Sequence, residues 1–293
     1  MMQDQVRVAA VSVDTKPGEI EENLEKISAW AGKAHQAGAG LVLFQELSLS
    51  GFIPNHPLGN HDKWLREALQ IGRKVAQPLD GPAVKGLVQI AKDRNILISA
   101  GMLEDAGNVL HNTQLLVDGN GLVGHWRKMH VPMYEMPFYN GGGVPEVAET
   151  SLGRIGVNIC FDSLLPESTR LLAVKNVEIV LFPFAADPPP VSPQGWANWA
   201  GVALRSRCVE NGVYGIACNY VGTVECAGVS QSFPGGGMVV DPRGKIIAEW
   251  SAGNGEPGMI VCDLSGDVLR EAQAEPEYLY RFRRPELYGG LTR

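Results

Sequence analysis

Short apolar runs of the kind that form β-strands recur along the whole chain and alternate with segments of helical periodicity. Apolar residues at positions 20, 24, 27 and 31 repeat at helical spacing, and Pro82 stands where the first turn of a helix over 83–94 would begin. Further helices are expected over 167–175 and 196–211. This alternation predicts an α/β fold in which helices cover β-sheets. The expected strands are 6–13, 41–44, 96–101, 113–117, 154–159, 179–182, 213–217, 238–240 and 259–261.

Two segments repeat one pattern, 114–126 (QLLVDGNGLVGHW) and 238–250 (MVVDPRGKIIAEW). Each has an apolar run, a turn that begins with Asp and ends with Gly, a second apolar run and a Trp. Asp and Gly suit the backbone angles of a hairpin turn, so both segments are predicted to be antiparallel hairpins. An internal duplication and convergence on the same turn residues explain the repeat equally well. Hairpins beside βα units disfavour a purely parallel barrel and favour a sandwich of two sheets.

The length of 293 residues allows one large domain, and 45% hydrophobic residues provide a sizeable core. Two stretches rich in Pro or Gly, 132–145 and 184–193, separate no segments of different composition. We therefore expect them to be long functional loops inside a single domain that spans 1–293. The acidic and aromatic segment from about 275 to 293 is expected to form a C-terminal arm that packs on a partner subunit.

The net charge of −7 and the absence of a basic run indicate a surface that repels phosphate backbones, so nucleic acid is not an expected partner. No stretch approaches the roughly 20 apolar residues of a membrane span. The first residues, MMQDQVRVAAVSV, are typical of a strand and not of a signal peptide. The five cysteines are odd in number and lack CxxC spacing, which predicts free thiols and a cytoplasmic location.

The strongest local feature is RIGVNICFDSLLPE, in which an apolar strand ends at Cys160 and a short connection leads into a helix. A sulfur there lies at the carboxyl end of a sheet, near backbone N–H groups that lower the pKa of a thiol, and is well placed for nucleophilic attack. A buried structural cysteine is the commoner case. That ordinary role suits Cys208, Cys218 and Cys262, which lie within apolar patterns.

Two other segments place charged side chains just after predicted strands. In QELSLSGF, Glu46 follows the strand 41–44 and is a candidate general base, although an ordinary turn acid is the commoner case. Lys128 follows the second strand of the first hairpin, and Glu135 comes a few residues later. A lysine can stabilise an oxyanion, and a nearby acid can keep that lysine charged and oriented. A solvated Arg-Lys pair is the ordinary alternative.

The segments QELSLSGF, WRKMHVP and NICFDSLLPE, in this order and at these separations, resemble the three catalytic blocks of the nitrilase superfamily of carbon-nitrogen hydrolases. The resemblance extends from residue 6 to about 264 and includes both hairpins. It implies a four-layer α-β-β-α sandwich and a homodimer or higher homo-oligomer. It implies no metal and no organic cofactor.

The same resemblance implies roles for individual residues. Glu46 would be the general base, Lys128 the oxyanion partner and Cys160 the nucleophile. Glu135 would be the supporting acid, and the backbone N–H of Phe161 would help to hold the oxyanion. The implied reaction is hydrolysis of an amide or N-carbamoyl compound through a cysteine acyl-enzyme, with release of ammonia or an amine.

The residues after the nucleophile bear on the substrate. In this superfamily, nitrilases usually carry Trp-Glu after the cysteine, so Phe161-Asp162 favours amide or carbamoyl substrates over nitriles. The tail YLYRFRRPELYGGL and the loop near Pro188 are similar to N-carbamoyl amino acid hydrolases. Those enzymes hold the substrate carboxylate with two arginines, and the matching positions here are Ser163 and Leu164. This difference favours a neutral or more apolar amide.

Phe52, Tyr134, Phe138 and Phe184 lie on candidate pocket loops and, together with Phe161, are predicted substrate contacts, although aromatic residues on such loops equally often serve loop packing. The alternatives that remain open are a nitrilase, a catalytically silent scaffold with the same fold, and acyl transfer to an acceptor other than water. Other signatures are missing: GNGLVG lies in a predicted hairpin turn and opens no helix, and neither GxSxG nor HExxH occurs. Dinucleotide binding and metal-dependent hydrolysis are therefore not expected.

Overall fold

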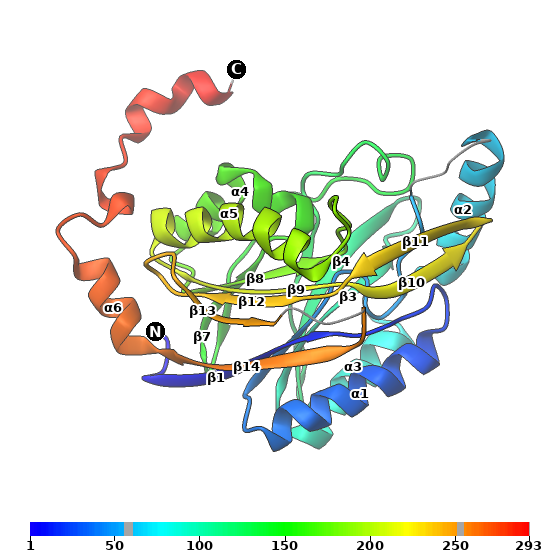
Figure 1. Cartoon of the computed structure of the whole chain (residues 1–293), viewed down its shortest axis with the longest axis horizontal. Helices are drawn as coiled ribbons and strands as arrows, with labels where there is room; N and C mark the ends of the chain where they lie inside the picture. Colours follow the sequence, from blue (N-terminus) through cyan, green and yellow to red (C-terminus); the bar gives the residue numbers. More distant parts are fainter. Residues whose placement is uncertain (56–60, 251–254, 293) are drawn as a thin grey trace.

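The computed structural model describes residues 1–55, 61–250 and 255–292. Two mixed β-sheets lie face to face, and helices cover the outer face of each, α1 and α3 on one side and α4 and α5 on the other (Figure 1). This is the predicted α-β-β-α sandwich. The helices are α1 (Ile20–Gln36), α2 (His61–Val75), α3 (Pro82–Arg94), α4 (Pro166–Ala173), α5 (Pro193–Asn211) and α6 (Gly266–Ala274), with 3-10 helices η1 (Cys160–Leu164), η2 (Leu279–Phe282) and η3 (Pro285–Thr292).

The first sheet has the strand order β14-β1-β2-β3-β4-β5 within the described residues. Strands β1, β2 and β3 are parallel, and helices α1 and α3 supply the connections between them, as parallel pairing requires. The other neighbours pair antiparallel. The strands are β1 (Gln5–Ser12), β2 (Leu41–Phe44), β3 (Leu97–Asp105), β4 (Leu110–Asp118), β5 (Gly121–Arg127) and β14 (Gly258–Ser265).

The second sheet has the order β13-β12-β9-β8-β7-β6 within the same described ranges. Strands β7, β8 and β9 are parallel, with α4 and α5 as their connections. A separate hairpin, β10–β11, extends beyond the sandwich beside α2 (Figure 1). The strands are β6 (Ala148–Thr150), β7 (Gly153–Val157), β8 (Ile179–Phe184), β9 (Tyr214–Asn219), β10 (Val221–Cys226), β11 (Val229–Pro234), β12 (Gly237–Val240) and β13 (Ile246–Trp250).

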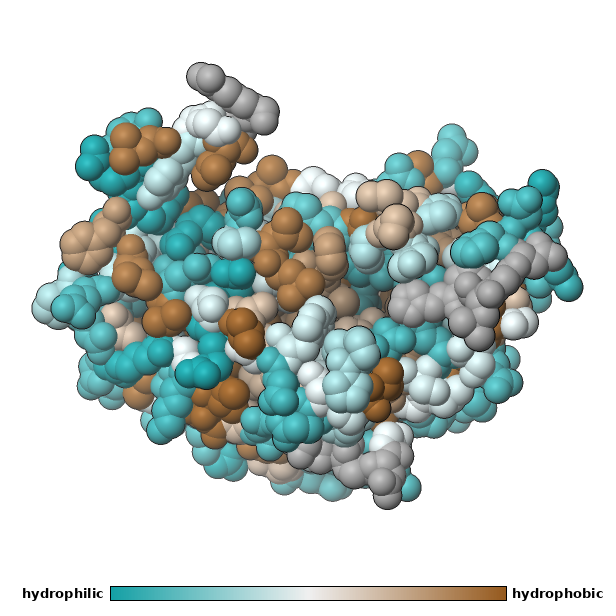
Figure 2. All heavy atoms as spheres, turned by 45° about the horizontal axis from the view of Figure 1, so that its top comes forward, coloured by the Kyte–Doolittle hydropathy of each residue, from teal (hydrophilic) through white to brown (hydrophobic). Residues whose placement is uncertain are grey.

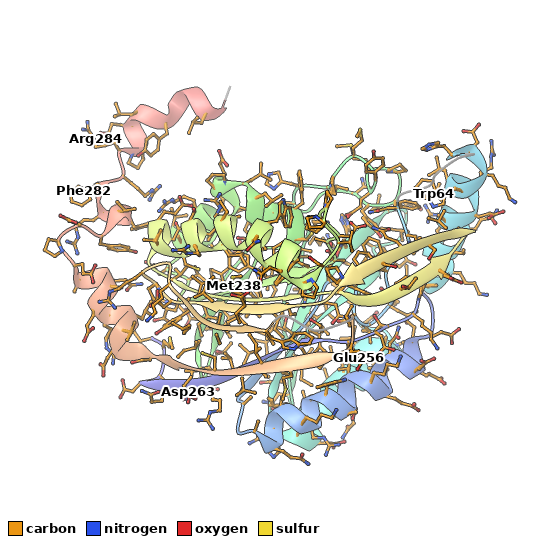
Figure 3. The ribbon with its side chains drawn as sticks, viewed as in Figure 1. Trp64, Met238, Glu256, Asp263, Phe282 and Arg284 are labelled. Atoms are coloured by element: carbon orange, nitrogen blue, oxygen red, sulfur yellow. The ribbon has the colours of Figure 1, made fainter. Side chains whose placement is uncertain are left out.

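The central strands are buried on both faces because each sheet packs against helices on one side and against the other sheet on the other. Every residue of β2 and β8 is buried, which explains why their sequences are continuous apolar runs. Met238, on β12 of the second sheet, is buried in the main core, which fills the space between the two sheets and under α4 and α5 (Figure 3). A second core fills the space under α1 and α3.

The two predicted hairpins are confirmed as β4–β5 and β12–β13. Sequence reasoning missed α2, α6, β6 and the hairpin β10–β11, whose sequences are more polar and partly exposed. All five cysteines are free thiols, as predicted. Within the described ranges, none of the helices combines the length and the apolar character that crossing a bilayer requires.

A third apolar cluster anchors the loops at one end of the sandwich. Phe52, from the loop after β2, packs edge-on against Tyr220 and Phe233, with ring centroids 6.1 and 5.0 Å away. Trp64 of α2 packs edge-on against Phe138 at 5.2 Å, and Figure 3 shows Trp64 at this end of the molecule. The loops that follow several strands are therefore packed against one another.

Candidate active site

Glu46 lies in a tight turn directly after the parallel strand β2 and is fully buried. The hydroxyl of Ser48 accepts a hydrogen bond from the backbone N–H of Gly101 at 3.1 Å, and Leu49 N–H donates to the carbonyl of Gly101 at 2.7 Å. A Cβ at Gly101 would come within 2.3 Å of the backbone nitrogen of Leu47, so only glycine fits here. The turn that carries Glu46 is thus fixed against strand β3.

Lys128, directly after β5, is fully buried and bridges two carboxylates. Its Nζ lies 2.8 Å from Oε1 of Glu46 and 2.7 Å from Oε2 of Glu135. Burial lowers the pKa of Lys128, but the carboxylates of Glu135 and Glu46 outweigh this effect and hold the pKa well above its ordinary value. Removing one partner of a buried ion pair typically costs about 3–5 kcal/mol. The charge of Lys128 is therefore stably maintained.

Asn112 on β4 holds both Glu46 and Lys128 in place. Its Nδ2 donates to Oε1 of Glu46 at 2.6 Å, and its backbone carbonyl accepts from the backbone N–H of Lys128 at 2.8 Å. Oε1 of Glu46 thus has two donors, whereas Oε2 is buried and has no hydrogen-bond partner among the described residues. One oxygen of this carboxylate is held and the other is left available as an acceptor.

Glu135 lies on the loop after Lys128 and is also buried. Burial raises the pKa of Glu135 to about 7, against the lowering effect of Lys128. Two carboxylates and one ammonium, those of Glu46, Glu135 and Lys128, are therefore buried together in one site.

Cys160 begins η1, just after the parallel strand β7, with a backbone φ of +46°. This left-handed conformation is uncommon outside glycine and costs about 1–3 kcal/mol. The Ser163 hydroxyl helps to hold it by donating to the carbonyl of Cys160 at 2.6 Å. Such a strained junction presents the side chain at the carboxyl end of the sheet, as the sequence predicted.

The pKa of Cys160 shifts in the direction opposite to the one expected from nearby backbone N–H groups. Burial raises the pKa of the thiol well above its ordinary value, and Glu46 raises it further, while Lys128 and a backbone hydrogen bond from Ala185 lower it. The resting thiol is therefore protonated, and attack by sulfur requires a base that removes the proton as the bond forms.

Asp162 joins the lysine segment to the cysteine segment. Its carboxylate accepts from the backbone N–H groups of Met129 at 3.2 Å and His130 at 2.8 Å, and from Ile159 on its own segment at 3.3 Å. The imidazole Nδ1 of His130 lies 2.9 Å from the same carboxylate. Asp162 is buried and positions the two segments, a role that its sequence context alone did not reveal.

A pocket of about 330 Å³ opens over Cys160. Of the five aromatic residues predicted to contact the substrate, Phe161 and Tyr134 line this pocket. The other three do not: Phe52 and Phe138 are buried in the loop-anchoring cluster, and Phe184 is buried in the main core. A larger cavity of about 830 Å³ elsewhere on the chain has none of the predicted site residues among its described lining.

Among the described residues, no group of three or more His, Cys, Asp or Glu side chains is arranged to hold a metal ion. The three sequence blocks instead supply one carboxylate, one ammonium and one thiol, which are in electrostatic contact. The carboxylate and the thiol follow the parallel strands β2 and β7, and the ammonium follows the antiparallel strand β5. A thiol with an adjacent base and an oriented cation suits acyl chemistry.

The chain is similar in sequence and in fold to known proteins. Residues 7–274 match the family described as carbon-nitrogen hydrolase. The chain is 29% identical to a nitrilase of Pyrococcus abyssi over 97% of this chain and 99% of the relative. It is 28% identical to a citrullinase of Francisella tularensis over 98% of both. A crystal structure of an amidase from Nesterenkonia sp. is 25% identical with a TM-score of 0.77, covering 99% of this chain and 98% of that one.

Proposed function

This chain belongs to the carbon-nitrogen hydrolase family, so it is a hydrolase of non-peptide carbon–nitrogen bonds, and we propose that Cys160 is its nucleophile. In this proposal Glu46 is the general base and acid, and Lys128 stabilises the oxyanion. The observation that carries it is the bridge from Lys128 Nζ to Oε1 of Glu46 at 2.8 Å, which leaves Oε2 without a partner among the described residues, while both charged groups interact electrostatically with the thiol of Cys160.

In the acylation step, Oε2 of Glu46 takes the proton of Cys160 while the sulfur attacks the carbonyl carbon of an amide or carbamoyl group. The C–N bond then breaks, and the leaving nitrogen receives the proton from Glu46, so that ammonia or an amine departs. Water gives a proton to Glu46 as its oxygen attacks the carbonyl carbon of the acyl-enzyme. The C–S bond then breaks, Glu46 returns that proton to the sulfur, and the acid product leaves. Glu46 therefore releases every proton that it accepts, and the enzyme ends the cycle in its starting protonation state.

The negative charge on the carbonyl oxygen needs donors that are in place before the reaction. Lys128 supplies a fixed positive charge, and the N–H of Phe161 is among the first groups of η1, which have no acceptor within the helix. Glu135 acts through Lys128, because its Oε2 lies 2.7 Å from Nζ and holds that group when Glu46 gains a proton. Glu135 is thus a positioning residue in this scheme.

The substrate is a small molecule with an amide or N-carbamoyl group, as in the amidase and citrullinase that the chain resembles. Similarity to a protein named nitrilase keeps nitriles as a second candidate. The test is ammonia release from a matched panel of aliphatic amides, ureas and nitriles. Turnover of amides or ureas that Cys160→Ala abolishes supports the proposal, and turnover of nitriles alone contradicts this substrate assignment.

We further propose that the chain forms a homodimer or higher homo-oligomer through the C-terminal arm, residues 275–293. Phe282 and Arg284 lie on this arm, away from the sandwich (Figure 3). Figure 2 shows apolar side chains on the arm, and the exposed ones are Leu279, Phe282, Leu287, Tyr288 and Leu291. Side chains of this kind on a single-domain subunit favour packing on a second copy. A monomer by sedimentation at micromolar concentration would contradict this proposal.

The location that we propose is the cytoplasm, because all five cysteines are free thiols, which suits a reducing compartment.

A further inference from the structure

The 3-10 helix η1, which begins with Cys160, ends where the chain cannot supply its next backbone donor. In a 3-10 helix the carbonyl of each residue accepts from the N–H three residues later, as Asp162 accepts from Leu165 at 3.2 Å. For Ser163 that later residue is Pro166, which has no N–H. Ser163 is fully buried, and a buried carbonyl without a donor costs free energy. The end of η1 therefore needs a donor from another part of the fold.

Arg207 of α5 supplies this donor. Its Nε donates to the carbonyl of Ser163 at 3.1 Å, and its Nη2 donates to the carbonyl of Leu164 at 3.4 Å. Ser163 and Leu164 are the last two residues of η1. A guanidinium holds its N–H groups in a rigid planar fork, so two such bonds fix both the position and the orientation of this end of the turn.

The guanidinium of Arg207 is itself fixed. Its Nη1 donates to Oε1 of Glu210, one turn further along α5, at 2.6 Å. Arg207 is only 7% exposed, and a charged side chain at such depth normally needs partners for its charge and its donors. The carboxylate of Glu210 and the two carbonyls of η1 provide them. Arg207 therefore has one defined place against η1.

The bonds at the end of η1 lead directly to Cys160. Ser163, whose carbonyl accepts from Arg207, also donates from its hydroxyl to the carbonyl of Cys160 at 2.6 Å. Cys160 has a φ of +46°, a conformation that the surrounding structure must impose. Asp162 holds the other end of the turn by accepting from the N–H of Ile159 at 3.3 Å. A carboxylate before Cys160 and a guanidinium after it thus hold the same short turn.

We infer that Arg207 is a positioning residue for the nucleophile. Through the carbonyls of Ser163 and Leu164 it holds η1, so that Cys160 keeps its left-handed backbone and its place relative to Glu46. This inference rests on the proposed function, because it concerns how Cys160 is held for attack. Arg207 is not among the residues that line the pocket over Cys160. Its loss should therefore impair the chemical step and leave substrate binding largely unchanged.

Arg207→Met tests this inference, because it removes the fork and keeps an unbranched apolar chain in its place. Steady-state kinetics uses the best amide or urea of the panel, and kcat is referred to the folded fraction that urea unfolding gives for each variant. We expect kcat to fall about 10- to 100-fold, the range for hydrogen bonds to a charged group, and KM to stay within about threefold. A purely structural brace would lower stability and leave kcat per folded molecule unchanged.

Arg207→Lys keeps the positive charge but not the rigid fork. Its kcat should lie between those of the wild type and Arg207→Met, at least about threefold below the wild type, with KM unchanged. This variant decides the question if Arg207→Met does not fold. A wild-type kcat in Arg207→Lys would then overturn the inference.

Arg205→Met is the matched control on the same helix. Arg205 donates from Nε to the carbonyl of Gly244 at 2.8 Å, in the turn of the hairpin β12–β13. Its loss removes the same kind of bond without touching η1, and kcat should not change. Equal decreases of kcat in Arg205→Met and Arg207→Met would overturn the inference. A kcat within about threefold of the wild type in folded Arg207→Met would overturn it as well.

Alkylation of Cys160 separates this inference from the catalytic proposal. If the wild-type enzyme releases no ammonia from any compound of the panel, the proposed function fails. The rate at which iodoacetamide modifies Cys160, followed by mass spectrometry of the digested protein, needs no turnover. This rate should be at least about threefold lower in Arg207→Met than in Arg205→Met, because the protonated thiol reacts only as the thiolate that a correctly placed Glu46 helps to form. Equal rates in the two variants would overturn the positioning role.

Discussion

Nδ2 of Asn112 donates a 2.6 Å hydrogen bond to Oε1 of Glu46, and both side chains are buried. The same oxygen accepts from Lys128, so the carboxylate cannot rotate without losing two donors. Oε2 has no partner among the residues that the structure describes. In the proposed reaction, this arrangement directs a single oxygen of the base toward the proton of the thiol.

Asn112→Ala should therefore lower kcat more than it changes KM. The hydrogen bond joins a neutral donor to a charged acceptor, and its loss corresponds to about 1.5–3 kcal/mol, or a decrease of about 10- to 100-fold in kcat. Steady-state kinetics on the best amide substrate measures both constants. Asn108→Ala removes an exposed asparagine from the loop before the same strand and should leave kcat unchanged. An unchanged kcat in Asn112→Ala would show that Glu46 is oriented without it.

The pKa of Glu135, raised to about 7 by burial, predicts a pH dependence. Only ionised Glu135 can hold the ammonium group of Lys128 by an ion pair, and the proposed reaction needs Lys128 in place. We therefore expect kcat/KM to rise with pH through about 7. The same group opposes folding in this range: its pKa is raised above that of the unfolded chain, so its contribution to stability decreases as pH rises from about 4.5 to 7.

Glu135→Gln should remove this limb of the pH profile and lower kcat/KM at pH 8. Glu146→Gln, which changes an exposed acid on the same loop region, should keep the limb. Profiles of kcat/KM from pH 5 to 9 for the three proteins make the comparison. A limb near pH 7 that persists in Glu135→Gln would assign it to another group of the cluster.

Asp162→Asn should destabilise the fold by about 2–3 kcal/mol, because a buried carboxylate that accepts three backbone N–H groups becomes a neutral amide. The hydrogen bond that His130 donates to Asp162 raises the pKa of the imidazole above its ordinary value of 6.5. The stability from this pair is present below 6.5 and is lost as pH rises through the raised pKa. The loss in Asp162→Asn should therefore be greater at pH 5 than at pH 9.

Urea unfolding at both pH values measures that difference. His130→Asn keeps the backbone hydrogen bonds of Asp162 and should lose only the part that depends on pH. Equal losses at pH 5 and 9 in Asp162→Asn would contradict an ionic contribution from His130.

Gly101→Ala should destabilise the protein by at least about 1–3 kcal/mol and reduce activity in the folded fraction. The new Cβ would lie 2.3 Å from the backbone nitrogen of Leu47 and 2.7 Å from Oε1 of Gln114, so the turn that carries Glu46 would have to move. Gly143→Ala is a matched control, because no atom lies within 4 Å of its Cβ position. The melting temperatures of the two variants, measured by thermal unfolding, test this prediction. Equal melting temperatures would show that strand β3 does not constrain the turn.

Strand and helix patterns predicted the α/β fold with two sheets, whereas the joint role of Glu46, Lys128 and Cys160 was predicted from the resemblance of three ordered segments to one superfamily. The strand patterns explain why these residues converge. Glu46 and Cys160 each follow a continuous apolar run, and such runs are parallel strands whose carboxyl ends meet at one edge of a sandwich. Lys128 follows a hairpin strand whose turn signal was strong. Apolar runs typical of strands, helical spacing of apolar residues and hairpin turn signals were enough to locate these elements.

The remaining features depend on tertiary packing that no local pattern reveals. Asn112 is a polar residue in a strand, and only the structure shows that its amide faces Glu46. Phe52 and Phe184 lie on the predicted loops and strand ends, yet both point into apolar cores. Asp162 was interpreted as a mark of the substrate class, whereas its carboxylate is occupied by backbone N–H groups. The role of each of these residues depends on the direction in which its side chain points, and the position in the sequence does not give that direction.

The central claim is that Cys160 forms a covalent acyl-enzyme with Glu46 as its base. The most direct measurement is mass spectrometry of the protein after rapid acid quench during turnover of a good amide substrate, with digestion to locate the modified residue. We predict an added acyl group on Cys160, absent from Cys160→Ala and accumulating far more slowly in Glu46→Gln. Full turnover with no acyl group on Cys160, or undiminished turnover in Cys160→Ala, would contradict the mechanism.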